Sequence, residues 1–198
     1  LPGPAGTIRE VTRLLGSAGF AAEAHATIGR GLLSLLIILI AALPLGLLAG
    51  RYSAVDRFLT VPVAVVRSTP VISVILLALI WFPSGGVPIF AAILMAFPLL
   101  FENLAAGVRS VDREYLEMAH SFRLRRSVLV RNLYLPAVAG YLGSGVRSAS
   151  GIVWKVVVAA EVLSQPGFGI GSRLYESRIY LETAGVFAWT TVLIVVSV

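Results

Sequence analysis

Nineteen consecutive uncharged residues, Gly31 to Ala49, constrain this chain more than any other stretch of its sequence. They read GLLSLLIILIAALPLGLLA, with Arg30 before them and Arg51 shortly after them. An α-helix needs about 20 mostly apolar residues to cross the hydrocarbon core of a bilayer. Of all residues, 58% are hydrophobic and 13% charged, whereas soluble domains have about 45–50% and about 25%. The sequence therefore predicts an integral membrane protein.

Further apolar segments predict an all-α, polytopic helical bundle that forms one transmembrane domain over residues 1–198. The expected spans are residues 31–50, 58–82, 87–108, 133–163 and 185–198. Glycines and prolines at residues 82–88 predict a tight turn between the second and third spans. We expect Pro62, Pro70 and Pro98 to kink the helices that contain them. Since the chain begins at Leu1 and ends inside an apolar run, we also expect it to be part of a longer protein.

The basic residues predict how the bundle is oriented in the membrane. The net charge is +6, and six arginines lie between residues 109 and 131. Two more lie in the short loop at residues 51–57. Loops rich in Lys and Arg stay on the cytoplasmic side, so we place both loops there and residues 164–184 outside. The arginines of the cytoplasmic loops account for the positive net charge, so we do not expect nucleic acid as a partner.

The segment at residues 111–132 is charged, yet it has an apolar pattern of its own. Between residues 111 and 122, apolar residues recur at the spacing of one helix face: Tyr115, Leu116, Met118, Ala119 and Phe122. The pattern predicts a short amphipathic helix outside the membrane. Such a helix either rests on lipid headgroups or inserts into the groove of a partner protein, and the pattern alone favours neither.

This segment resembles the "EAA" loop of permease subunits in binding-protein-dependent ABC importers. That motif reads Glu-Ala-Ala, three residues, Gly, nine residues, an apolar residue, one residue and Leu-Pro. Here residues 117–119 read Glu-Met-Ala and residues 133–136 read Leu-Tyr-Leu-Pro, so the spacing is met over twenty residues. Arg123 stands where the motif has glycine. A left-handed residue with a Cβ costs about 1–2 kcal/mol, so we expect a differently built turn or a tolerated strain.

The resemblance extends over nearly the whole chain and is to permeases of the nitrate, sulfonate and taurine type. LPGPAGTIREVTRLL at the start and GVRSVDREYLEMA before the loop are similar to the corresponding stretches of that family. In VAAEVLSQPGFGIGSRL, residues 167–169 occupy the family's usual Gly-Leu-Gly site. The resemblance implies the ABC importer permease fold, with about five of six spans present and residues 111–132 as a cytoplasmic coupling loop.

The function implied by the resemblance is that of a multi-pass permease subunit in the cell inner membrane. It would form the pathway of an ATP-driven importer, and separate ATPase subunits would hydrolyse ATP. The sequence has no Gly-x-x-x-x-Gly-Lys-Ser/Thr phosphate loop, so we expect no enzymatic activity, catalytic residue or cofactor in this chain. The two histidines, His25 and His120, are far apart in the sequence. We therefore expect no metal site. The implied ATPase contacts are Glu114, Tyr115, Glu117, Met118, Ala119, His120, Phe122 and Arg123.

The resemblance implies several partners besides the ATPase subunits. These are a second permease copy, an external solute-binding protein and the surrounding lipid. Small residues at every fourth position of the 133–163 span allow close helix contact, either within the subunit or with the second copy: Gly140, Ser144 and Ser148, and also Gly145 and Ala149. The outer segment at residues 164–184 would meet the binding protein or act as an outer plug.

Ionisable residues inside the expected spans are the candidates for the pathway. Each costs about 2.5–3.5 kcal/mol on insertion scales, so they face a watery cavity or the bundle interior. The candidates are Arg67, Glu102, Arg147, Lys155 and Glu161. The alternative is structural, namely ion pairing such as Glu102 with an arginine, or snorkelling from helix ends. An excess of positive charge in the interior would favour an anionic solute such as a sulfonate, nitrate or carboxylate.

The sequence is also compatible with other functions. A secondary transporter driven by an ion gradient would favour internal repeats, which are not evident here, and would leave the amphipathic loop without a role. A membrane scaffold or enzyme subunit would not need charges deep in the spans. An ABC permease for a vitamin such as riboflavin or a thiamine precursor remains an alternative, because the sequence does not identify the solute.

Overall fold

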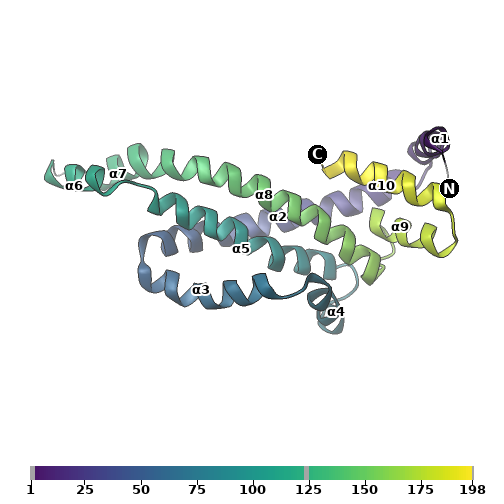
Figure 1. The fold of residues 1–198 in the computed structure, drawn as a ribbon, viewed down its shortest axis with the longest axis horizontal. Helices are drawn as coiled ribbons and strands as arrows, with labels where there is room; N and C mark the ends of the chain where they lie inside the picture. Colours follow the sequence, from purple (N-terminus) through teal and green to yellow (C-terminus); the bar gives the residue numbers. More distant parts are fainter. Residues whose placement is uncertain (1–2, 123–124, 198) are drawn as a thin grey trace. The chain divides into compact units, whose positions relative to one another are not determined.

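The protein is all-α, as its sequence predicts (Figure 1). The computed structural model describes residues 3–122 and 125–197, and every regular element in those ranges is a helix. In chain order the elements are α1 Pro4–Leu15, α2 Phe20–Arg51, α3 Ser53–Ser68, α4 Val71–Trp81, α5 Val87–Arg109, α6 Arg113–Ser121, α7 Arg126–Leu129, the π-helix η1 Val130–Tyr134, α8 Leu135–Ser164, α9 Ile170–Ile179 and α10 Thr183–Ser197.

Two helices in the described part of the chain are long and apolar enough to cross a membrane on their own. They are α2, with 32 residues, and α5, with 23 residues. The pair α3 and α4 would supply a third crossing if the two helices form one span. With 30 residues, α8 is also long enough, because an α-helix rises about 1.5 Å per residue, but its polar and charged residues lower its hydropathy. Among the described residues, α10 is a shorter apolar helix.

The segment expected as one span at residues 58–82 is interrupted at Thr69 and Pro70. Thr69 has φ −78° and ψ 128°, and Pro70 has φ −62° and ψ 131°, so both are extended. A residue before proline is disfavoured in the α region, which ends α3 and lets α4 start after Pro70. Pro62 and Pro98, by contrast, lie inside α3 and α5 without ending them.

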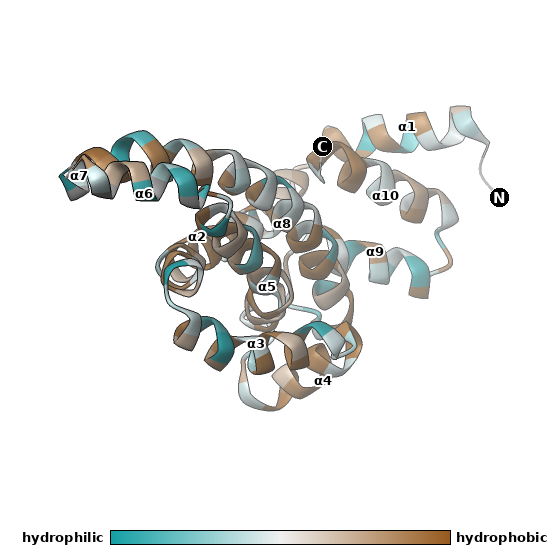
Figure 2. Cartoon of the chain, turned by 60° about the vertical axis from the view of Figure 1, so that its left-hand side comes forward, coloured by the Kyte–Doolittle hydropathy of each residue, from teal (hydrophilic) through white to brown (hydrophobic). Residues whose placement is uncertain are grey.

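The chain forms two compact units whose boundaries fall inside α2, α5 and α8 and between α3 and α4. The first contains residues up to Ser34, Pro70–Ile93 and residues from Gly151 on. Its core joins α1, α9 and α10 around buried apolar side chains, namely Leu14, Ile170, Ala188, Trp189 and Val192. Figure 2, coloured by hydropathy, shows α1 and α9 beside the largely hydrophobic α10. The expected turn after α4 is present, since the Gly86 N–H donates to the Pro83 carbonyl at 2.8 Å.

The second unit, Leu35–Thr69 and Leu94–Ser150, is built around α5. A Cβ on Gly46 of α2 would lie 2.6 Å from the Leu104 Cβ, and one on Gly50 would lie 2.5 Å from the Val108 Cβ. These glycines therefore let α2 approach α5 closely. On its other side α5 packs against α8, where Gly107 meets the ring of Tyr141.

Candidate functional site

The predicted coupling segment contains α6, whose apolar residues divide between two environments. The Asp112 carboxylate accepts a hydrogen bond from the Glu114 N–H at 3.2 Å where the helix begins, the usual N-terminal capping arrangement. Ala119 is buried. Three larger apolar side chains are exposed instead: Tyr115 by 55%, Met118 by 51% and Phe122, just past the helix end, by 74%.

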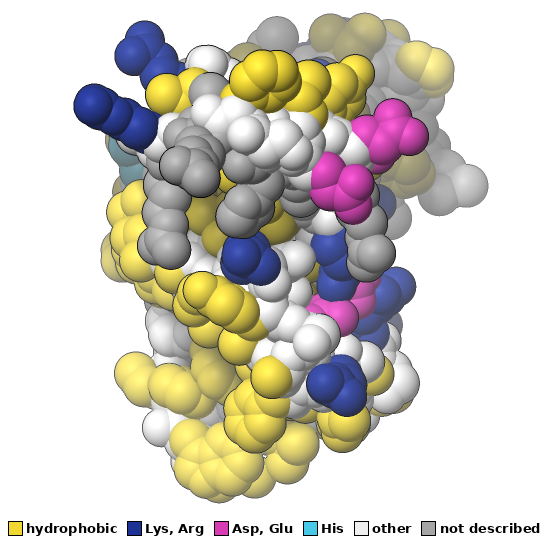
Figure 3. All heavy atoms as spheres, turned by 90° about the vertical axis from the view of Figure 1, so that its left-hand side faces the viewer, with side chains coloured by type: hydrophobic (Ala, Val, Ile, Leu, Met, Phe, Trp, Pro, Cys, Tyr) yellow, Lys and Arg dark blue, Asp and Glu magenta, His cyan; other side chains and the backbone are white. Residues whose placement is uncertain are grey.

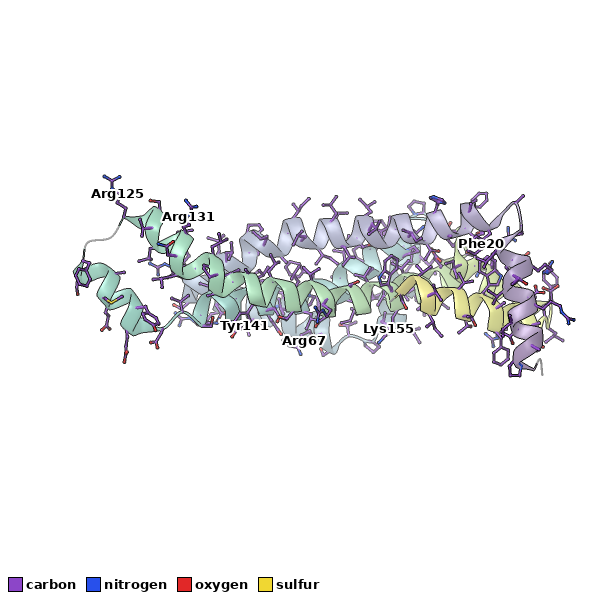
Figure 4. The ribbon with its side chains drawn as sticks, turned by 90° about the horizontal axis from the view of Figure 1, so that it is seen from above. Phe20, Arg67, Arg125, Arg131, Tyr141 and Lys155 are labelled. Atoms are coloured by element: carbon purple, nitrogen blue, oxygen red, sulfur yellow. The ribbon has the colours of Figure 1, made fainter. Side chains whose placement is uncertain are left out.

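The exposed apolar side chains of α6 are surrounded by charge. Glu114 and Glu117 are also exposed, and Figure 3 shows acidic, basic and hydrophobic side chains side by side at this end of the second unit. Arg125 and Arg131 project away from the ribbon in Figure 4. The side chain of His120 and all of Arg123 lie outside the part of the chain that the structure describes. An exposed apolar row flanked by charged side chains is suited to a hydrophobic groove on a partner.

An unbroken helical stretch begins at Arg126, inside the coupling segment, and ends at Ser164. Its first part includes the π-helix η1, in which the Leu135 N–H bonds to the Val130 carbonyl five residues earlier. Pro136 has no N–H to donate to the carbonyl four residues before it, and its ring crowds that carbonyl. The widened turn accommodates the proline without a break, so α7, η1 and α8 run on as one element.

Two of the predicted pathway residues form an ion pair in the second unit. The Arg67 Nη1 lies 2.7 and 2.6 Å from the two carboxylate oxygens of Glu102. A second pair, Arg109 with Asp56, joins the same two helices at 2.8 Å. Asp56 and Arg67 are eleven residues apart on α3, or about 16 Å. The structural alternative for Glu102, an arginine partner, is therefore present.

A pocket of about 700 Å³ lies along α3 and α5 at these two ion pairs. Its lining combines the four charged residues with small and apolar ones: Asp56, Thr60, Val63, Ala64, Arg67, Ser68, Phe101, Glu102, Ala106 and Arg109. The ion-paired side chains remain about one-third to three-fifths exposed. Charged side chains avoid lipid, so a face with this lining is suited to contact with water or protein.

Arg147 and Lys155 are exposed on α8 and take part in no ion pair among the described residues. With Gly151 between them they are spaced by four residues each and share one helix face, as the sequence predicts. They are the pathway candidates whose positive charge stays uncompensated in the described part of the chain.

Glu161, the fifth candidate, is fully buried in the first unit rather than placed on the open face of α8. Its carboxylate accepts three hydrogen bonds: from the Arg30 guanidinium at 2.6 Å, from the Thr27 hydroxyl at 2.9 Å and from the Gly171 N–H at 3.0 Å. A buried carboxylate needs such donors because an unpaired charge inside a protein costs several kcal/mol.

A second buried carboxylate, Glu23, completes this network. It accepts the Gly169 N–H at 2.5 Å and the Arg173 Nε at 2.8 Å. The Ile170 N–H donates to the Thr27 hydroxyl at 2.8 Å, so three consecutive N–H groups at the start of α9 are bound by side chains of α2 and α8. We call Glu23, Thr27, Arg30, Glu161 and Arg173 the carboxylate clamp.

The carboxylate clamp also explains the two glycines at the start of α9, Gly169 and Gly171. Gly169 has φ +147°, and a Cβ there would lie 2.6 Å from the Glu161 carboxyl carbon. A Cβ on Gly171 would lie 2.6 Å from the Glu161 Cβ. The hydrogen bond to Glu23, followed by that to Glu176, raises the pKa of Arg173 above its ordinary value. Thus hydrogen bonds from the backbone of Gly169, Ile170 and Gly171 hold the start of α9 against α2 and α8.

Sequence reasoning found Glu161 but missed the other four members of the clamp. One signal was available, because Glu23, Thr27 and Arg30 are spaced by four and three residues and therefore lie on one helix face. Arg173 gave no such signal, since its partner Glu23 is 150 residues away in the chain.

The two rows of small residues on α8 differ in their surroundings. Gly145 and Ala149 are buried, and a Cβ on Gly145 would meet Leu100 at 2.9 Å and Asn103 at 3.0 Å. Gly140, Ser144 and Ser148 are exposed instead. The first row therefore packs within the subunit, and the second remains open. Among the described residues, no group of three or more His, Asp or Glu is placed to hold a metal ion.

Comparison with known proteins identifies relatives over most of the chain. Residues 42–198 match the model of the family described as "Binding-protein-dependent transport system inner membrane component". A probable ABC transporter permease protein of Brucella melitensis is 27% identical over 188 residues, which cover 94% of this chain and 76% of that protein. A Bacillus subtilis protein named as a putative aliphatic sulfonates transport permease is 27% identical over 99% of this chain and 71% of its own length.

A solved structure with the same fold extends the comparison to three dimensions. It is described as the crystal structure of an amino acid ABC transporter with histidines. The match has a TM-score of 0.69, covers 100% of this chain and 94% of the other, and has 14% sequence identity. At that identity the likeness concerns the fold.

Proposed function

Since this chain belongs to the family of binding-protein-dependent transport system inner membrane components, we propose that it is the permease subunit of an ATP-driven importer for a small anionic solute. Residues 1–198 form one permease domain of the multi-pass inner-membrane type. The observation that carries the proposal is the exposed row of Tyr115, Met118 and Phe122 on a charged helix outside the apolar segments.

In this proposal α6 docks into a cleft of a separate cytoplasmic ATPase subunit. Tyr115, Met118 and Phe122 fill the cleft, while Glu114 and Glu117 contact its rim. His120 and Arg123 belong to the same contact by the family motif. Ala119 is buried, so its role is to seat α6 on this chain. The docking favours an orientation with both basic loops in the cytoplasm.

The unbroken stretch from Arg126 to Ser164 is the element that would carry the ATPase movement into the membrane. A continuous helix transmits displacement better than a hinged one, and Pro136 is accommodated without a hinge. ATP-driven closure of the ATPase subunits would move α6 and, through this stretch, reorient the spans between outward and inward access.

The solute pathway would include the α3–α5 pocket and the open face of α8. Glu102 neutralises Arg67, so the attraction for an anion comes mainly from Arg147 and Lys155. The name of the Bacillus relative, an aliphatic sulfonate permease, points to the same class of solute. The open row Gly140, Ser144 and Ser148 would contact a second copy of the subunit, and the remaining apolar faces would contact lipid.

The test of this function is co-purification of an ATPase with the affinity-tagged subunit from native membranes. Glu117→Arg should abolish co-purification, because it reverses a charge beside the exposed apolar row. The control is Glu10→Arg, on α1 in the other unit, which should leave the amount of ATPase unchanged. A wild-type complex that contains no nucleotide-hydrolysing subunit would refute the proposal. Uptake of a neutral or cationic solute in place of sulfonates would refute its anionic cargo.

A further inference from the structure

A pocket of about 300 Å³ lies in the first unit, between the loop that follows α8 and one face of α9. In this unit α9 and α10 pack side by side (Figure 1). The pocket shares no residue with the α3–α5 pocket of the expected pathway, and we call it the loop pocket. Its lining includes Gln165, Ser172, Arg173, Glu176, Ile179 and Tyr180.

A buried hydroxyl at the loop pocket has no hydrogen-bond partner. Ser172 is only 6% exposed, and its hydroxyl makes no hydrogen bond within the described part of the chain. Buried side-chain hydroxyls are almost always hydrogen-bonded, to protein or to another molecule. Since Ser172 lines the pocket, a polar group of an occupant is placed to supply the missing hydrogen bond.

Two opposite charges lie side by side in the lining of the loop pocket. The Arg173 Nη1 donates to the Glu176 carboxylate at 2.5 Å, and the Arg173 Nε donates to Glu23. Among the described residues, the Arg173 Nη2 and the second Glu176 oxygen make no hydrogen bond. The two side chains are also 40% and 46% exposed. The pocket therefore offers a guanidinium to an anion and a carboxylate to a cation, which suits a zwitterion better than an ion of one sign.

The loop adds a further hydrogen-bond acceptor. Gln165 has φ +46°, which is uncommon for a residue with a side chain. Its side-chain N–H donates to the Val162 carbonyl at 2.7 Å, and its amide oxygen is left as an acceptor. Together with Ser172 and Glu176, it gives the lining three acceptors. A primary ammonium has three N–H donors, so the lining matches such a group in number.

The loop pocket adjoins an exposed apolar tip. Two of its lining residues, Ile179 and Tyr180, are 57% and 69% exposed, and Leu181 beside them is 83% exposed. The apolar helix α10, within the expected span at residues 185–198, begins at Thr183. Residues at the end of a span lie at the level of the lipid headgroups, where tyrosine is enriched. The pocket thus combines polar lining groups with an apolar rim next to a membrane segment.

We propose that the loop pocket binds the headgroup of a phosphatidylethanolamine lipid from the surrounding bilayer. The ammonium of the headgroup contacts Glu176 and Ser172, and its phosphate contacts Arg173. The acyl chains pass over the exposed side chains of Ile179 and Tyr180. The inference goes beyond the proposed function, because it needs only that α10 enters the membrane and depends on neither the solute nor the ATPase.

The test measures lipid binding to the intact transporter after its purification in detergent and removal of co-purified lipid. Phosphatidylethanolamine is titrated in, and bound lipids are counted by native mass spectrometry. We expect it to bind about tenfold more tightly than phosphatidylcholine, whose quaternary ammonium has no N–H, or phosphatidylglycerol, which has no ammonium, in line with a lost hydrogen bond to a charged group. Equal binding of the three lipids would overturn the proposal.

A matched pair of variants separates the pocket from general effects of a buried hydroxyl. Ser172→Ala should weaken phosphatidylethanolamine binding about fivefold, in line with one lost hydrogen bond. Ser164→Ala is the control, because the Ser164 hydroxyl is equally buried and also without a partner in the described part of the chain, yet Ser164 does not line the loop pocket. Its affinity should equal that of the wild type. Equal affinities of the two variants would overturn the proposal.

Two further measurements identify the source of the headgroup. Glu176→Gln should abolish the preference for phosphatidylethanolamine over phosphatidylglycerol. Glycerophosphoethanolamine has the same headgroup without acyl chains, and at equal concentration it should leave the lipid bound. Displacement of the lipid would overturn the proposal in favour of a soluble zwitterion. In every such case, unchanged co-purification of the ATPase shows that the proposed function itself still stands.

Discussion

Arg30 and Glu161 form a buried ion pair at 2.6 Å that joins α2 to α8, and the Glu161 carboxylate is entirely shielded from solvent. The same carboxylate accepts the Gly171 N–H, so the pair also fixes the start of α9. Removal of one partner of such a pair is costly, because the other charge stays buried without compensation.

We therefore expect Glu161→Ala to destabilise the subunit by about 3–5 kcal/mol. Glu161→Gln keeps the shape and one acceptor oxygen, so its cost should be smaller, about 1–3 kcal/mol. The measurement is the unfolding midpoint of the detergent-solubilised subunit. Glu10→Gln, on the surface of α1, is the control and should stay within about 0.5 kcal/mol of the wild type. A wild-type midpoint for Glu161→Ala would show that the pair does not hold the unit together.

Gly169→Ala should disrupt the same region from the backbone side. Gly169 has φ +147°, and the added methyl would meet the Glu161 carboxylate at 2.6–2.8 Å. We expect a loss of at least about 2 kcal/mol, since strain at a positive φ alone costs about 1–3 kcal/mol. The matched control is Gly140→Ala, where a Cβ has nothing within 4 Å. Equal expression yield and equal thermal stability for the two variants would contradict this account.

The sequence alone predicts the apolar helices α2 and α5 well, because length and hydropathy depend on neighbouring residues. The sequence is less informative about whether a given proline ends its helix. Pro62, Pro70 and Pro98 look alike in sequence, yet only Pro70 coincides with a helix break. The break there depends on Thr69, which leaves the helical region just before Pro70.

In the candidate site, the sequence likewise does not show which residues far apart in the chain come into contact. Both rows of small residues on α8 are visible in the sequence, but which row is buried depends on where α5 packs. The sequence leaves open whether Glu102 lines a pathway, pairs with an arginine or extends from a helix end, and the structure shows that it pairs with Arg67. The spacing of Glu23, Thr27 and Arg30 indicates a shared helix face but does not show that this face is buried. Arg173 is not identified from the sequence because its partner Glu23 is 150 residues away.

The Arg67–Glu102 pair should behave as one unit in transport. Arg67→Glu would place two carboxylates together in the α3–α5 pocket, and Glu102→Arg would place two guanidinium groups there, so each should reduce solute uptake about tenfold or more. Arg67→Glu combined with Glu102→Arg restores the pair in the opposite sense and should recover much of the activity. Uptake into proteoliposomes measures this. A double variant no better than either single one would show that the two residues act separately.

The open row of α8 should lie near its equivalent in a second subunit. The chain contains no cysteine, so a single introduced cysteine reports one position without further engineering. Ser148→Cys, on the open row, should form a disulfide-linked dimer under mild oxidation in native membranes, as seen on a non-reducing gel. Ala149→Cys is the matched control, because Ala149 is fully buried against its own subunit and cannot reach a second copy. Dimers from Ala149→Cys, or none from Ser148→Cys although its thiol reacts with maleimide, would exclude this face of α8 as the contact between copies.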